Sequence, residues 1–122
     1  MSIGEYLGSL ESRLQEPGEL VTSWSIEREI DTNLGIGFIK SQITFLDGSR
    51  LDFSEQLPIE RRKFRLHYMD ARDVLIVRWD SAPHPKGLAT FPSHKHTPEG
   101  VTGHGAITLI EALDEIIRTL KV

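Results

Sequence analysis

Two runs of alternating residues meet at a tight turn in the stretch GFIKSQITFLDGSRLDFSEQL, residues 37–57. The apolar positions that share one face of these runs are Gly37, Ile39, Ile43, Phe45, Leu51, Phe53 and Leu57. A period of two is typical of strands that bury one face. Asp47-Gly48 lies between the runs, and this pair is a strong hairpin signal because both central turn positions must accept positive φ. The stretch therefore predicts a β-hairpin with one face against a core.

The period of two continues on both sides of this hairpin. Residues 20–30 alternate in the same way before a break at residues 33–35, and residues 63–68 place Phe64, Leu66 and Tyr68 on one face. Residues 74–79 are apolar on both faces, which is typical of a central strand. Because these strands follow one another without helices between them, we expect a five-strand antiparallel meander and no doubly wound nucleotide-binding fold.

Helical periods flank the strands at both ends. One apolar stripe consists of Ile3, Leu7, Leu10 and Leu14, and the other of Ile110, Leu113, Ile117 and Leu120. Each stripe is preceded by a pair at capping-box spacing, Ser2 with Glu5 and Thr108 with Glu111. Since each helix has a single apolar stripe, we expect both to pack on one face of the sheet. The predicted fold is α+β, in a single domain over residues 1–122.

The composition narrows the class of protein. The chain has 122 residues, a net charge of −4 and no cysteine, so disulfides, a thiolate nucleophile and a cysteine zinc site are excluded. Its longest strictly apolar run is Val74–Val77, far short of the roughly 20 residues that a membrane span needs. The first residues carry neither a basic region nor an apolar block, unlike a signal peptide. We therefore expect a cytoplasmic protein without a membrane partner.

Charge is unevenly distributed along the sequence. Residues 61–104 contain eight Lys or Arg and four Asp or Glu, whereas the remainder contains six and fourteen, respectively. All five histidines also lie in residues 61–104. This asymmetry favours a polyanion-binding patch on an acidic body. The alternative is that the charges are scattered over a solvated surface.

Residues 81–105 have no sustained period. They contain four prolines, four glycines and four of the five histidines. A loop of this length without its own structure is uncommon in a compact domain and is usually functional or disordered. We therefore expect the chemistry of this protein to lie in or beside this loop.

Arg78 and Asp80 occupy the same face of the last predicted strand, immediately before the loop. In the functional interpretation, Arg78 grips a phosphate and Asp80 orients Arg78 or a histidine. In the structural interpretation, the two form an ion pair that holds the end of the strand, which contributes little if it is exposed.

His84, His94 and His96 are the candidate acid and base. Two imidazoles can deprotonate a ribose 2′-hydroxyl and protonate the leaving oxygen, which are the proton transfers that RNA cleavage requires. Lys95 or Arg78 would stabilise the charge that develops on the phosphate.

Two other interpretations of the same histidines stay open. His-x-His is a common metal-ligand spacing, and His84 or Asp80 would complete a metal site. In the second interpretation, residues 81–105 form a polar loop that happens to be rich in histidine. His67 alternates with Leu66 and Tyr68 and is interpreted as a surface histidine, and His104 as a loop contact.

Three motifs resemble the TumE-like family, whose members are toxin components of type II toxin–antitoxin modules. They are DGSRLDFSE (residues 47–55), RWDSAPH (residues 78–84) and PSHKH (residues 92–96). The resemblance runs from about Ile36 to Leu120. It implies a growth-inhibiting protein with an antitoxin encoded alongside. The family pattern often has additional histidines where this sequence has Pro85 and Ser93, so two metal ligands would be missing.

Together these observations predict a toxin-like, metal-independent endoribonuclease. Its expected catalytic residues are His84, His94 and His96, and its expected substrate-binding residues are Arg78, Asp80 and Lys95. No cofactor or metal is expected. The candidate partners are RNA, a cognate antitoxin protein and a second copy of this chain. The alternatives are a non-catalytic module that binds an antitoxin and a histidine-based, metal-dependent hydrolase.

Overall fold

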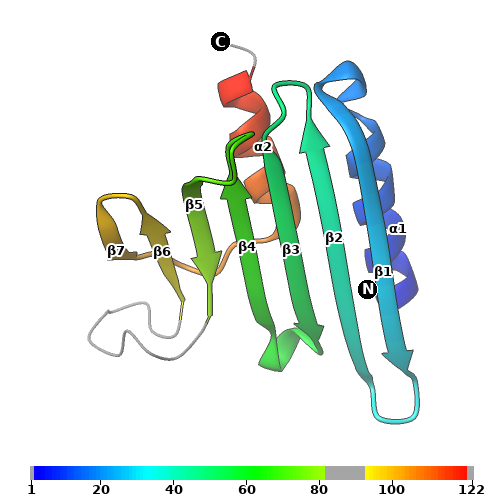
Figure 1. Cartoon of the computed structure of the whole chain (residues 1–122). Helices are drawn as coiled ribbons and strands as arrows, with labels where there is room; N and C mark the ends of the chain where they lie inside the picture. Colours follow the sequence, from blue (N-terminus) through cyan, green and yellow to red (C-terminus); the bar gives the residue numbers. More distant parts are fainter. Residues whose placement is uncertain (1, 82–92, 121–122) are drawn as a thin grey trace.

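The computed structural model of the chain describes residues 2–81 and 93–120 (Figure 1). Its helices are α1 (Ile3–Gln15), η1 (Gly18–Leu20), η2 (Ile59–Arg61) and α2 (Leu109–Leu120). Its strands are β1 (Val21–Asp31), β2 (Ile36–Phe45), β3 (Arg50–Leu57), β4 (Lys63–Met69), β5 (Leu75–Asp80), β6 (His94–Thr97) and β7 (Gly100–Gly103). The α+β class is confirmed.

The strands form one antiparallel sheet in the order β1-β2-β3-β4-β5-β6-β7, so every strand pairs with its neighbours in sequence. The predicted meander is confirmed for β1 to β5, but the prediction of five strands is wrong, because β6 and β7 lie in the segment expected to be a loop. Each has only four residues, HKHT and GVTG, without apolar alternation. They are held by backbone pairing to β5 and to each other, which no local pattern reveals.

The predicted hairpin between β2 and β3 is confirmed, but of the pair Asp47-Gly48 only Gly48 has a positive φ. Gly48 has a φ of 85°, which favours glycine. The Asp47 carboxylate accepts hydrogen bonds from the backbone N–H and the hydroxyl of Ser49, the former at 2.9 Å. The backbone of Phe45 and Ser49 then closes the hairpin with a hydrogen bond of 2.9 Å.

Both helices lie on one face of the sheet, as predicted (Figure 1). Burial alternates along β2 and β3, and the buried positions join the apolar stripes of α1 and α2 in one core cluster. Both capping boxes are present: Glu5 N–H donates to Ser2 Oγ at 3.1 Å, and Glu111 N–H donates to Thr108 Oγ1 at 3.2 Å. None of the helices in the described ranges is long and apolar enough to span a membrane.

A buried polar network on the helix side of the sheet ties together α1, β3, the residue between η2 and β4, and the segment that leads into α2. Glu55 is 1% exposed and accepts hydrogen bonds from Tyr6 Oη and from Arg62 Nε. Arg62 Nη2 also donates to the carbonyl oxygen of Ile107 at 2.9 Å. Burial, followed by the hydrogen bond and charge of Glu55, raises the pKa of Tyr6 far above its ordinary value.

The face of the sheet away from α1 and α2 is called the open face below. It carries the positions that alternate with the core, and within the described ranges neither α1 nor α2 covers it. The expectation that residues 74–79 are buried on both faces is wrong at their start, because Val74 and Ile76 are exposed. Further along β5, the open face carries Arg78 and Asp80, and these residues begin the candidate site.

Candidate functional site

Antiparallel pairing places polar side chains from three strands next to one another on the open face. Along one row, His67 on β4 is the cross-strand neighbour of Arg78 on β5, and Arg78 is the neighbour of His96 on β6. Along the next row, Arg65, Asp80 and His94 are neighbours in the same way. Directly opposed residues interact across strands, so the two rows form one continuous polar surface.

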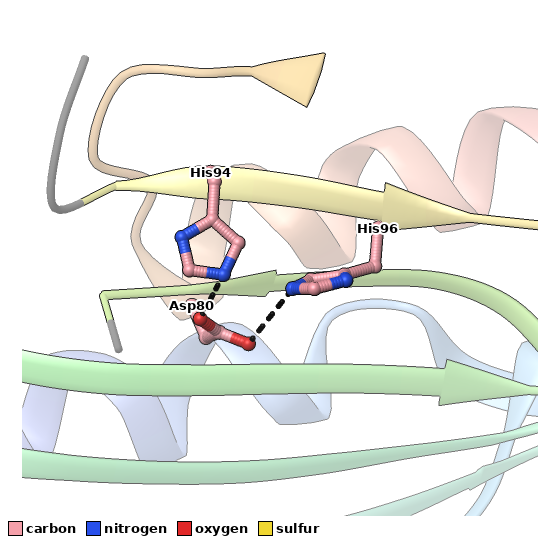
Figure 2. A group of neighbouring side chains, drawn as sticks. All are labelled: Asp80, His94 and His96. Carbon is pink, nitrogen blue, oxygen red and sulfur yellow. Dashed lines mark ion pairs between the residues drawn. The ribbon is translucent and has the colours of Figure 1, made fainter. Parts of the chain in front are cut away.

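The Asp80 carboxylate is the centre of this surface. Its Oδ1 lies 2.6 Å from Nε2 of His94, and its Oδ2 lies 3.6 Å from Nε2 of His96. Arg78 Nε donates a hydrogen bond of 3.0 Å to Oδ2. Figure 2 shows both imidazoles extending from β6 toward the carboxylate on β5. The ring centroids of His94 and His96 are 4.6 Å apart, in an edge-to-face arrangement.

Arg78, Asp80, His94 and His96 are called the Asp80 cluster below. Their exposure to solvent separates them into two layers. Asp80 and His94 are 4% and 1% exposed, so they are enclosed. The side chains of Arg78 and His96 are 26% and 13% exposed. A large substrate can therefore touch Arg78 and His96, whereas Asp80 and His94 are placed to orient them.

The structure thus brings together four of the six residues singled out in the sequence. Lys95 is separated from the four, because successive residues of a strand point to opposite faces. It is the cross-strand neighbour of Trp79 on the helix side, where its Nζ lies 5.8 Å from the centroid of the Trp79 ring. His84 lies outside the described residues.

His67 belongs to the same surface, although the sequence favoured a simple surface histidine. It is half-buried between Asp52 on β3 and Arg78 on β5. Burial lowers the pKa of His67 below its ordinary value, the positive charges of Arg65 and Arg78 lower it further, and Asp52 opposes the shift. The alternation in residues 63–68 indicates that His67 points outward, but only the strand register shows that it lies beside Arg78.

Asp80, His94 and His96 are also a potential metal-ligand set. One carboxylate oxygen and one nitrogen from each ring lie within 4.8 Å of one another. Two imidazoles and a carboxylate suit zinc and other transition metals. Against a metal, the guanidinium of Arg78 already supplies a positive charge at Oδ2. The same three side chains are thus arranged for acid–base chemistry or for metal binding.

Comparison with known proteins identifies the family to which the chain is similar. The model of the family described as toxin TumE matches residues 10–121. No curated protein and no solved structure matches the chain. The matched range contains the whole sheet, α2 and the cluster around Asp80.

Proposed function

We propose, from the premise that this chain belongs to the TumE toxin family, that its toxic activity is cleavage of RNA. As a member of that family, the chain is the toxin component of a toxin–antitoxin module, and a cognate antitoxin is its implied partner. The finer proposal is a metal-independent endoribonuclease whose site is the Asp80 cluster on the open face. A second copy of the chain stays a predicted partner.

The observation that carries the proposal is the pair of partly exposed groups held by one buried carboxylate. Arg78 and His96 both approach Oδ2 of Asp80, at 3.0 and 3.6 Å. An arginine held in this way presents a fixed guanidinium that matches the geometry of a phosphate. An imidazole beside it is placed to move a proton at the same phosphodiester.

In this proposal each residue has a distinct role. Arg78 binds the phosphate and stabilises the negative charge that develops in the transition state. His96 transfers a proton and touches the substrate. Asp80 stabilises positive charge on His96 and fixes the orientation of Arg78, while His94 holds Asp80 from the enclosed side. His84 stays a candidate from the sequence.

The direct test is to incubate the pure protein with RNA in the presence of excess EDTA. We expect cleavage at an unchanged rate, because the proposed chemistry uses imidazole and guanidinium groups alone. The protein for this test should be purified without a histidine tag, and its metal content measured in parallel. Wild-type protein that leaves RNA intact with and without divalent metal would refute the proposal, and would favour the non-catalytic module that binds an antitoxin.

The second candidate function is a metal-dependent hydrolase, which the closeness of the three ligand atoms favours. It predicts the opposite outcome of the same experiment. EDTA would abolish cleavage, zinc or another transition metal would restore it, and the untreated protein would contain about one metal ion per chain.

RNA is expected to approach the site from the β4 side. Lys63 and Arg65 on the open face of β4 are exposed, and neither forms an ion pair with any described residue. The open-face positions at the end of β1, after Ser25, are acidic instead. They are Glu27, Glu29 and Asp31. A polyanion is attracted to the first strip and repelled by the second.

Arg65→Ala therefore tests this path. We expect weaker binding of a single-stranded RNA made non-cleavable by 2′-O-methyl groups, together with a smaller dependence on salt. Loss of one phosphate contact lowers the slope of log K against log salt by about 0.7. Fluorescence anisotropy across a salt series measures both quantities. Arg118→Ala, an exposed cation on α2, is the control that changes net charge equally. Equal effects of the two variants would refute a specific path.

A further inference from the structure

We infer that His67 is the second imidazole of the site and acts as the general base on the opposite side of Arg78 from His96. The inference rests on the proposed ribonuclease function and deepens it. Of the two imidazoles in the Asp80 cluster, that of His96 is partly exposed, with a side chain 13% exposed, whereas His94 is 1% exposed. Cleavage of RNA by acid–base chemistry uses two proton transfers, at different oxygens of the same phosphodiester.

The strand register supplies the geometry. His67, Arg78 and His96 are consecutive cross-strand neighbours on β4, β5 and β6, and all three lie on the open face. Adjacent strands are about 4.8 Å apart, so the backbones of the two histidines are about 10 Å apart with the arginine between them. A phosphate bound to Arg78 would therefore lie between two imidazoles that approach it from opposite sides.

The environment of His67 suits a base. The charged groups that face it are Arg65 on its own strand, Asp52 on β3 and Arg78 on β5. Burial and the two arginines outweigh the aspartate, so the pKa of His67 lies below the ordinary value of 6.5. The imidazole is then neutral near pH 7 and ready to accept a proton. Its Nδ1 is enclosed and forms no hydrogen bond with the described residues.

The step balances without an oxidant or a further reactant. Neutral His67 removes the proton of the ribose 2′-hydroxyl, and the 2′-oxygen forms a bond to phosphorus. The bond between phosphorus and the 5′-oxygen of the next nucleotide breaks, and protonated His96 donates its proton to that oxygen. The products are a 2′,3′-cyclic phosphate and a 5′-hydroxyl end. Asp80 is placed to stabilise the imidazolium of His96 before the transfer.

The experiment compares two oligonucleotides that differ at the leaving atom. One has the natural 5′-oxygen at a single ribonucleotide linkage, and the other has sulfur there, which leaves without being protonated. We expect His96→Ala to lose about 10²–10⁴-fold in rate on the oxygen substrate and to recover most of that loss on the sulfur substrate. We expect His67→Ala to lose a similar factor on both substrates. Gln42→Ala, a polar open-face position on β2, is the matched control and should cleave both at the wild-type rate.

Two further measurements exclude a merely structural role for His67. Added imidazole should partly restore cleavage by His67→Ala. The wild-type dependence of kcat/KM on pH should show an acid limb below pH 6.5, which needs no variant and therefore does not depend on the folding of one. His67→Ala at the wild-type rate, recovery of its activity by the sulfur substrate, or an acid limb above pH 6.5 would each overturn the inference.

Failure of this inference is distinguishable from failure of the proposed function. If the wild-type protein cleaves RNA and His67→Ala is equally active, His67 is not the base, but the ribonuclease proposal stands. If the wild-type protein cleaves neither oligonucleotide, both are refuted.

Discussion

His96→Ala is expected to reduce kcat/KM for RNA cleavage by about 10²–10⁴-fold, the contribution of one general acid or base. His96 is the imidazole of the Asp80 cluster that a substrate can reach, with a side chain 13% exposed and Nε2 3.6 Å from the carboxylate. The measurement is the initial rate of cleavage of a fluorogenic RNA by the purified variant, with thermal unfolding recorded in parallel. Cells that express the variant should also grow where cells that express the wild type do not.

The matched control is His104→Ala. His104 lies near Trp79, with ring centroids 6.4 Å apart, and Trp79 is part of the helix-side core. The variant His104→Ala should cleave RNA at a rate within a few-fold of the wild type. If His96→Ala and His104→Ala were both as active as the wild type, the Asp80 cluster would not be the site of cleavage.

Glu55→Ala is expected to lower the free energy of unfolding by about 3–5 kcal/mol, the usual cost of removing one partner from a buried ion pair. The change leaves the guanidinium of Arg62, which is 11% exposed, and the hydroxyl of Tyr6 without their acceptor. Urea unfolding measures the loss as a lower midpoint at an unchanged m-value. Because the network joins α1 to β3 and to the entry of α2, the whole transition should shift.

A combined variant separates the cost of the unpaired charge from the contribution of the network. Glu55→Leu with Arg62→Met and Tyr6→Phe removes the three polar side chains at once and leaves only the Ile107 carbonyl oxygen without its donor, so it should recover much of the lost stability. Glu60→Ala, an exposed acid on η2, is the control and should stay within about 0.5 kcal/mol of the wild type. A loss below about 1 kcal/mol for Glu55→Ala would contradict the structural role assigned to this network.

The β2–β3 hairpin and the starts of both helices could be predicted from the sequence, because each depends on a local pattern. The alternation in residues 37–57 and the turn at Asp47-Gly48 predicted β2, β3 and their hairpin, because side-chain direction in a strand depends only on position along it. The capping pairs at Ser2 and Thr108 predicted where α1 and α2 begin, because each cap needs only residues three positions apart in the sequence.

The short strands could not be predicted in this way. Residues 94–97 and 100–103 carry no apolar alternation, and they become strands because the edge of β5 offers them backbone partners. Because residues 94–97 form a strand, the side chain of Lys95 points to the opposite face of the sheet from those of His94 and His96. A correct assignment of β6 would have placed Lys95 on the other face from the sequence alone.

For Glu55 and His67, the sequence indicates which face of the strand the side chain occupies but not which residues it contacts. Glu55 occupies a core position of an alternating strand, yet its partners Tyr6 and Arg62 come from 49 residues before it and 7 residues after it. His67 was visible as an outward residue, but its neighbour Arg78 is set by the register of β4 against β5.

Local patterns in this chain thus established the α+β class, the first five strands, both helices and a set of histidines and charges worth testing. Periodicity and capping are properties of neighbouring residues, so they can be read without the rest of the molecule. Strand pairing settled which of those residues meet: it brought Arg78, Asp80, His94, His96 and His67 to the open face and put Lys95 behind it. That outcome depends on contacts between distant segments, which a local pattern does not encode.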